Sequence, residues 1–150
     1  MVGEDETSPD VRVGGEGPGA VQLRFHGLER SFPEDDDRMR DFTATVHGEA
    51  VRIEVMVRTW GGDDLDGFLA ELAEDFRGWR GARTWGSLER DLTLSAEHTG
   101  RVVRLAWGLH DGLHRDRWHF ELTTEHDPGE EMRNLAGDVR TFLKSEPLGP

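Results

Sequence analysis

Polar and apolar residues alternate in six short segments of the chain, the pattern of β-strands that bury one face. Turn-forming residues such as Asp111-Gly112 separate several of them. Each run of three strands is therefore expected to form an antiparallel meander. The segments are residues 21–25, 42–46, 51–57, 92–96, 103–109 and 118–122.

Two other segments repeat their apolar residues with helical spacing. From Leu65 to Trp79 a single apolar stripe predicts an amphipathic helix, and Asp63, Asp64 and Asp66 are expected to cap its start. A second helix is predicted after Asp127-Pro128. The apolar face of this second helix comprises Met132, Leu135, Ala136, Val139, Phe142 and Leu143.

The order of these elements, three strands and a helix repeated once, predicts an α+β fold. We expect one antiparallel sheet of about six strands with both amphipathic helices packed on one face. Residues 72–79 and 135–142 share Leu, Ala, Asp and Arg at equivalent positions. A duplicated half-domain explains this similarity, and so does the independent use of common helix residues.

Residues 1–19 are predicted to form a disordered acidic tail, because they carry five acids and one arginine and offer little to bury. Removing residues 1–18 should then leave thermal stability unchanged. Residues 20–145 are expected to form a single α+β domain, and residues 146–150 a C-terminal tail.

Composition excludes several classes of function. The chain has 31 acidic and 18 basic residues and a formal net charge of −13, which argues against binding to nucleic acid or an anionic membrane. It has no cysteine, so disulfides, thiol catalysis and thiolate metal sites are excluded. Without a secretory signal or a membrane-length apolar segment, the expected location is the cytoplasm.

Histidines are the first candidates for chemistry, since five of the seven lie between His98 and His126. His110 and His114, with nearby aspartates, have the composition of a metal site, but Asp111-Gly112 indicates a hairpin loop there. We therefore favour ordinary surface histidines and predict no metal and no cofactor. His119 is expected to face solvent. No hydrolase motif is present, and no catalytic residue is assigned.

The leading hypothesis is an acidic protein-interaction domain without catalysis, of the immunity type that neutralises a basic partner such as a nuclease toxin. Its acidic surface would attract such a partner over a long range. The alternative explanation for the acids is solubility alone. The predicted contact residues are Glu34, Asp35, Asp36, Asp37, Glu71, Glu74, Asp75 and Trp85.

The second hypothesis is a small-molecule-binding domain or enzyme with a pocket between sheet and helices. Trp85 enters both hypotheses, because it lies in a polar connection where it either plugs the end of the sheet or anchors a ligand. The predicted lining of the pocket is Trp60, Trp85, His110, His114 and His119.

One segment carries a resemblance to known proteins. Gly78-Trp79-x-Gly81-x-x-x-Trp85-x-Ser87-Leu88, followed by alternating strands and a C-terminal helix, resembles an uncharacterised family of small actinobacterial proteins of unknown function. The resemblance covers about residues 50–145. It implies no activity, substrate or catalytic residue.

Overall fold

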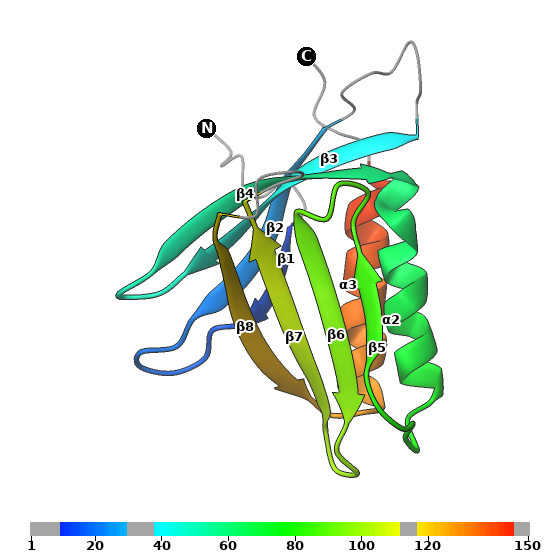
Figure 1. The fold of residues 1–150 in the computed structure, drawn as a ribbon. Helices are drawn as coiled ribbons and strands as arrows, with labels where there is room; N and C mark the ends of the chain where they lie inside the picture. Colours follow the sequence, from blue (N-terminus) through cyan, green and yellow to red (C-terminus); the bar gives the residue numbers. More distant parts are fainter. Residues whose placement is uncertain (1–9, 30–37, 112–116, 146–150) are drawn as a thin grey trace, which may run out of the picture.

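The computed structural model describes residues 10–29, 38–111 and 117–145 and has an α+β fold (Figure 1). Two antiparallel sheets of four strands each, with the strand orders β1-β2-β3-β4 and β5-β6-β7-β8, are called sheet A and sheet B here. Two α-helices lie side by side next to them. The elements are β1 Val11–Gly14, β2 Gln22–Glu29, β3 Met39–His47, β4 Arg52–Trp60, the 3-10 turn η1 Gly61–Asp64, α2 Leu65–Glu74, β5 Arg83–Gly86, β6 Leu92–His98, β7 Val103–His110, β8 His119–His126 and α3 Glu130–Lys144.

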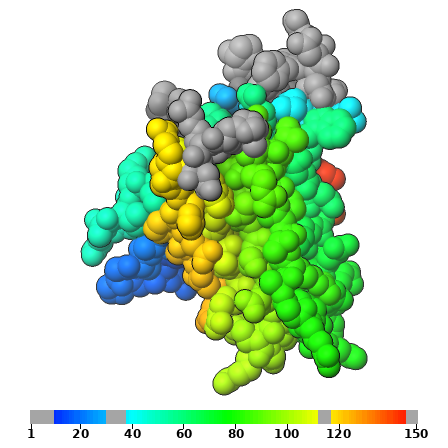
Figure 2. Space-filling model, viewed as in Figure 1, coloured from blue at the N-terminus to red at the C-terminus, as the bar shows by residue number. Residues whose placement is uncertain are grey.

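The expectation of one sheet of about six strands is wrong. Each predicted meander is a separate sheet with one additional strand, β1 or β5, on its edge. Both additional strands have only four residues, too few to give a clear alternating pattern. In the space-filling view, β5–β8 form one surface (green to orange), and the hairpins of sheet A (blue and teal) project from its side (Figure 2).

The two halves of the chain have the same order of elements, four strands followed by a helix. This order agrees with the duplicated half-domain and equally with two independent antiparallel units. The duplication therefore stays a hypothesis.

Strand β1 lies inside the segment predicted to be a tail. It pairs antiparallel with β2, placing Val11 opposite Phe25 and Val13 opposite Leu23. The two valines are only 1% and 3% exposed. The predicted tail is therefore wrong for residues 11–14, whose two apolar side chains complete the edge of sheet A. Residues 1–9 and 146–150 lie outside the described residues.

Aromatic rings join the two sheets and one helix in the core. Phe25 of β2 lies 5.1 Å from Phe42 of β3 and 5.8 Å from Trp107 of β7, measured between ring centroids. Phe42 in turn meets Phe142 of α3 edge-on at 5.5 Å. Trp107 is fully buried, and its indole N–H donates to Thr124 Oγ1 at 3.0 Å. Sheet A, sheet B and α3 therefore share one core.

Helix α2 is shorter than predicted, because the backbone leaves helical geometry at Asp75 (φ −89°, ψ 41°). Phe76 is consequently 49% exposed rather than buried on the helix. Trp79 packs instead on sheet B, where its indole N–H donates to the Ala96 carbonyl at 3.2 Å. Helix α3 agrees with the prediction, since all six residues of its predicted apolar face are buried.

The acids at the start of α2 do not cap the helix. Asp64 is at the N-cap position but makes no capping side-chain hydrogen bond. Asp63 Oδ2 accepts the Leu88 N–H at 2.7 Å, and Asp66 pairs with Arg140 at 3.1 Å. These acids therefore tie the start of the helix to sheet B and to α3. Glycine is required at position 62, directly before these acids, because its φ is +83° and a Cβ would lie 2.7 Å from Leu143.

Deleting residues 1–18 is now expected to destabilise the protein. Two valine side chains would leave the core, each worth roughly 1.5–3 kcal/mol when fully buried, so the free energy of unfolding should fall by about 3–6 kcal/mol. Urea unfolding of the full-length and shortened chains measures this difference. Val13→Asp in the full chain should cause a comparable loss, whereas Arg12→Ala, at a side chain 60% exposed, should cause little. Equal stability of the two chains would show that β1 contributes nothing to the fold.

Candidate functional site

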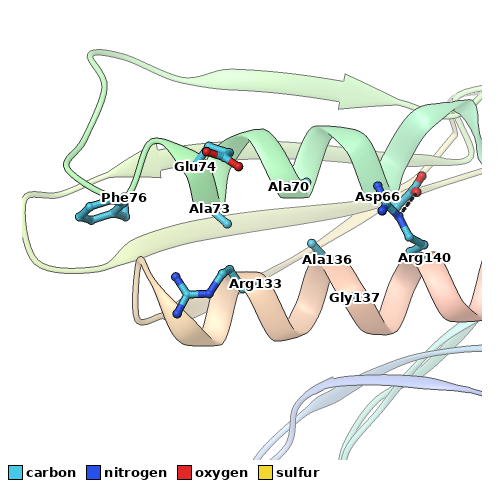
Figure 3. Close-up of a pocket in the computed structure, with 9 residues that line it drawn as sticks. All are labelled: Asp66, Ala70, Ala73, Glu74, Phe76, Arg133, Ala136, Gly137 and Arg140. Carbon is cyan, nitrogen blue, oxygen red and sulfur yellow. Dashed lines mark hydrogen bonds and ion pairs between the residues drawn. The ribbon is translucent and has the colours of Figure 1, made fainter.

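A groove of about 420 Å³ runs between α2 and α3. Its small side chains allow the two helices to approach closely and leave a shallow apolar floor. Figure 3 shows side chains from the two helices facing each other across the gap. The floor is formed by Ala70 and Ala73 of α2 and by Ala136 and Gly137 of α3.

Charged and aromatic residues border this groove. The ion pair between Asp66 and Arg140, 3.1 Å long, crosses it at one end. Phe76 and Arg133 lie at the other end, and Glu74 lies on the α2 side (Figure 3). With Phe76 half exposed, the groove combines an apolar floor, an aromatic ring at one end and charges on its rim.

The predicted acidic contact residues divide into two groups. Glu71, Glu74 and Asp75 are exposed on or directly after α2, and Glu74 lines the groove. Asp75 pairs with Arg83 at 2.6 Å, which ties the end of α2 to β5. The acids at positions 34–37 lie outside the described residues.

The predicted lining of the second hypothesis does not form one pocket. Trp60 and Trp85 meet around Asp63, whose Oδ1 accepts the Trp60 N–H at 3.3 Å and whose carbonyl accepts the Trp85 indole N–H at 2.8 Å. The rings of His110 and His119 stack with centroids 5.7 Å apart. Trp85 and His119 are on opposite edge strands of sheet B, with β6 and β7 between them, so about 14 Å separates their strands.

Individual residues of that lining serve the fold. Trp60 is 47% exposed and lies under the guanidinium of Arg38, 4.2 Å from the ring centroid. His110 Nε2 lies 2.8 Å from Thr93 Oγ1. His119 is exposed, as predicted, and His114 lies outside the described residues. Trp118, the first residue of the predicted strand 118–122, lies just before β8 and is 42% exposed.

A second polar cluster joins the ends of the two sheets. Asp41 is 2% exposed and pairs with Arg58, directly opposite on β4, at 3.2 Å. Asp91, at the start of sheet B, accepts the backbone N–H of Arg58. Burial and the neighbouring Glu89 raise the pKa of Asp91 to about 6, against the opposing effect of Arg58. Because these contacts are made within the fold, we interpret the cluster as the polar junction between the sheets.

A larger hollow, about 710 Å³, lies where β1, β8 and α3 meet. At its wall, Trp107 donates to Thr124 Oγ1, and Thr124 Oγ1 lies 2.7 Å from His126 Nε2. Burial lowers the pKa of His126, against a smaller opposing effect of Glu131. The lowered pKa favours the neutral imidazole. The Thr124 hydroxyl can then donate to His126, completing a chain of hydrogen bonds from the core to the hollow.

Comparison with known proteins identifies the family of this chain. The model of a family described as a family of unknown function, DUF6228, matches residues 15–146. The chain belongs to this family. No curated protein and no solved structure matches the chain. The expectation that the chain belongs to a family of unknown function is therefore confirmed, and the matched region includes β2–β8, α2 and α3.

Two further findings concern the described residues of this DUF6228 member. Across residues 10–29, 38–111 and 117–145, no three His, Asp or Glu side chains are placed to hold a metal ion. In the same ranges, no helix has the length and apolar character needed to cross a membrane.

Sequence reasoning missed the groove, although a signal was present. The repeated Leu-Ala pairs at 72–73 and 135–136 place Ala73 and Ala136 in its floor. A small residue on each of two adjacent amphipathic helices is typical of a close helix–helix contact. The aromatic end was missed because Phe76 was counted as part of the buried stripe.

Replacing Asp91 by Asn should stabilise the protein at pH 8. The folded-state pKa of about 6 lies above the ordinary value of 3.8, so the folded protein binds this proton more tightly than the unfolded chain. The charged carboxylate therefore destabilises the folded protein in full above pH 6. This destabilisation shrinks as the pH falls and is absent below about pH 4. Asn removes the charge and keeps an oxygen for the Arg58 N–H.

Urea unfolding of both proteins at pH 8 and pH 4 measures this effect. We expect the variant to be more stable at pH 8 by on the order of 1 kcal/mol and equally stable at pH 4. A difference independent of pH would contradict the raised pKa of Asp91.

Proposed function

We propose that this protein is a binding domain without catalytic activity that docks a basic segment of a partner protein on the face formed by α2 and α3. The observation that carries the proposal is the α2–α3 groove, which has an apolar floor, a half-exposed phenylalanine at one end and an acidic wall. An immunity-type role, in which the partner is a basic enzyme such as a nuclease, is the specific form of this proposal.

The charge of the two walls supports a basic partner. Residues 63–77, which contain α2, carry six acids and one arginine, whereas residues 130–144 of α3 carry three acids and three basic residues. The negative charge is therefore concentrated on the α2 side, where Asp66 and Glu74 line the groove, while Arg133 and Arg140 line it from α3. Lysine or arginine side chains of a partner would be attracted to Glu71 and Glu74, and the net charge of −13 would speed the encounter.

The apolar part of the groove supports affinity. Exposed aromatic residues beside a hollow are the usual energetic centres of protein interfaces. Phe76 is 49% exposed at the end of a groove of about 420 Å³, a volume that admits a large apolar side chain. A partner segment that combines basic residues with one apolar residue therefore fits this face.

The second candidate function is small-molecule binding in the hollow between β1, β8 and α3. Its volume of about 710 Å³ and the partly buried His126 favour it. However, the Thr124 and His126 side chains that reach its wall are engaged with each other and with Trp107, within 3.0 Å. The α2–α3 face is preferred because the Phe76 ring is 49% exposed, with the guanidinium of the neighbouring Arg77 5.7 Å from its centroid.

Selection of displayed random peptides against the immobilised full-length protein tests the proposal. We expect the selected peptides to combine lysine or arginine with a large apolar residue. Their affinity, measured by fluorescence anisotropy, should fall about tenfold for the double variant Glu71→Lys/Glu74→Lys, since each exposed ion pair contributes roughly 0.2–1 kcal/mol and here becomes repulsive. Added salt should weaken binding to the native chain.

Two matched controls distinguish this face from the rest of the surface. Glu97→Lys/Glu121→Lys changes the net charge equally at exposed positions of sheet B and should leave binding nearly unchanged. Gly137→Phe should block the groove, since a Cβ at Gly137 has no atom within 4 Å, and Gly137→Ala should not. Selected peptides without basic residues, or equal binding to all four variants, would refute the proposal.

A further inference from the structure

The outer face of sheet A carries a group of basic side chains that neither the core nor the α2–α3 face uses. Alternation along the strands turns them away from Leu23, Phe25 and Val46, which are buried. We call this group the basic patch. It consists of Arg12 on β1, Arg24 and His26 on β2, His47 on β3 and Arg52 on β4.

The strand register places basic side chains opposite each other in this patch. Arg12 lies directly opposite Arg24, and His47 lies directly opposite Arg52. Cationic side chains directly opposite each other destabilise a sheet. Glu54 on β4 pairs with Arg52 at 3.7 Å, but the register still places the arginines of β1 and β2 directly opposite each other. Such an arrangement is expected where several cations must face one anion.

The two opposed arginines already converge on a single anionic oxygen. Arg24 Nε donates to Asp10 Oδ2 at 2.8 Å, and Arg12 Nε donates to the same oxygen at 3.1 Å. Burial raises the pKa of Asp10, but the hydrogen bonds from Arg24 and Arg12 outweigh it, so the net pKa is lowered. Each guanidinium has five N–H donors, and in these two hydrogen bonds only its Nε–H donates to the carboxylate oxygen.

A concavity of about 360 Å³ lies over the patch, and no carboxylate lines it. Its lining adds the amide of Gln22 and the hydroxyl of Thr45 to the basic side chains. Thr45 Oγ1 donates to Glu54 Oε2 at 3.3 Å, so the His26 ring nitrogen 2.9 Å away acts as its donor. The groups that the concavity offers to one ligand are therefore the guanidiniums, the His47 imidazole and the Gln22 amide.

We propose that the basic patch binds a phosphate group, either as the free ion or as a small phosphomonoester. Phosphate presents several oxygens to donors on different strands, and arginine matches it with paired N–H groups. The site would hold the phosphate between Arg12, Arg24 and Arg52, with His47 beside them. It is distinct from the α2–α3 face, because the two surfaces share no residue.

Titration of the full-length protein with inorganic phosphate and with phenyl phosphate, followed by isothermal calorimetry and backbone amide NMR, tests this proposal. Sodium chloride at matched ionic strength is the reference. We expect amide shifts centred on residues 22–26 and 45–52 with either probe, and a rise in the pKa of His26, which burial and Arg24 lower in the free protein. If phenyl phosphate binds more tightly, the site is assigned to phosphomonoesters. If inorganic phosphate binds more tightly, the site is assigned to the free ion.

Variants at exposed positions keep the test independent of folding. Arg12→Ala and Arg52→Ala replace side chains that are 60% and 67% exposed, and each should weaken phosphate binding at least about tenfold. Arg104→Ala removes an arginine paired with Glu125 on sheet B and should leave binding unchanged. Shifts no larger than those in sodium chloride, or equal binding by all three variants, would overturn the proposal.

Discussion

The contact of Phe25 with Phe42 and Trp107 is the interaction on which the rest of the structure depends. Phe25 is the residue at which the inner face of sheet A contacts sheet B. Phe42, which packs on Phe25, also contacts Phe142 of α3. Neither sheet is hydrogen-bonded to the other in the described strand order. Side-chain packing, rather than backbone pairing, therefore holds the halves together.

This core decides where ligands can bind. The inner faces of both sheets and the apolar faces of the helices are occupied by the shared core. The surfaces that remain include the outer faces of sheets A and B, the outer α2–α3 face and the hollow where the sheets diverge. The acids of α2 and the arginines of sheet A come from different strands and helices, so a chain of net charge −13 presents both an acidic and a basic surface.

The sequence predicted the long elements well. Val51, Ile53, Val55 and Val57 mark β4, and the six buried residues of α3 have clear helical spacing. Short elements were missed, because the two valines of β1 and the segment Arg83–Gly86 give too little periodicity. The number of sheets was missed because local alternation carries no information on which strands pair.

The candidate sites were predictable only in part. Exposure of Glu71, Glu74 and Asp75 followed from helical spacing, but the groove beside them depends on how α2 packs against α3. The histidines and tryptophans of the predicted pocket did not converge on one pocket, since β5 and β8 are opposite edges of sheet B. The basic patch depends on register, which sets Arg12 against Arg24 through strand β1, and that strand was not predicted.

Native-state hydrogen exchange tests most directly whether one aromatic core joins the two halves. The slowest amides of β3 in sheet A and of β7 in sheet B should open with the same free energy, equal to that of global unfolding. Trp107→Leu should lower both values by the same amount, roughly 2–4 kcal/mol, because it removes one ring of the shared core. Separate opening energies for the two sheets, with only β7 responding to the substitution, would contradict this account.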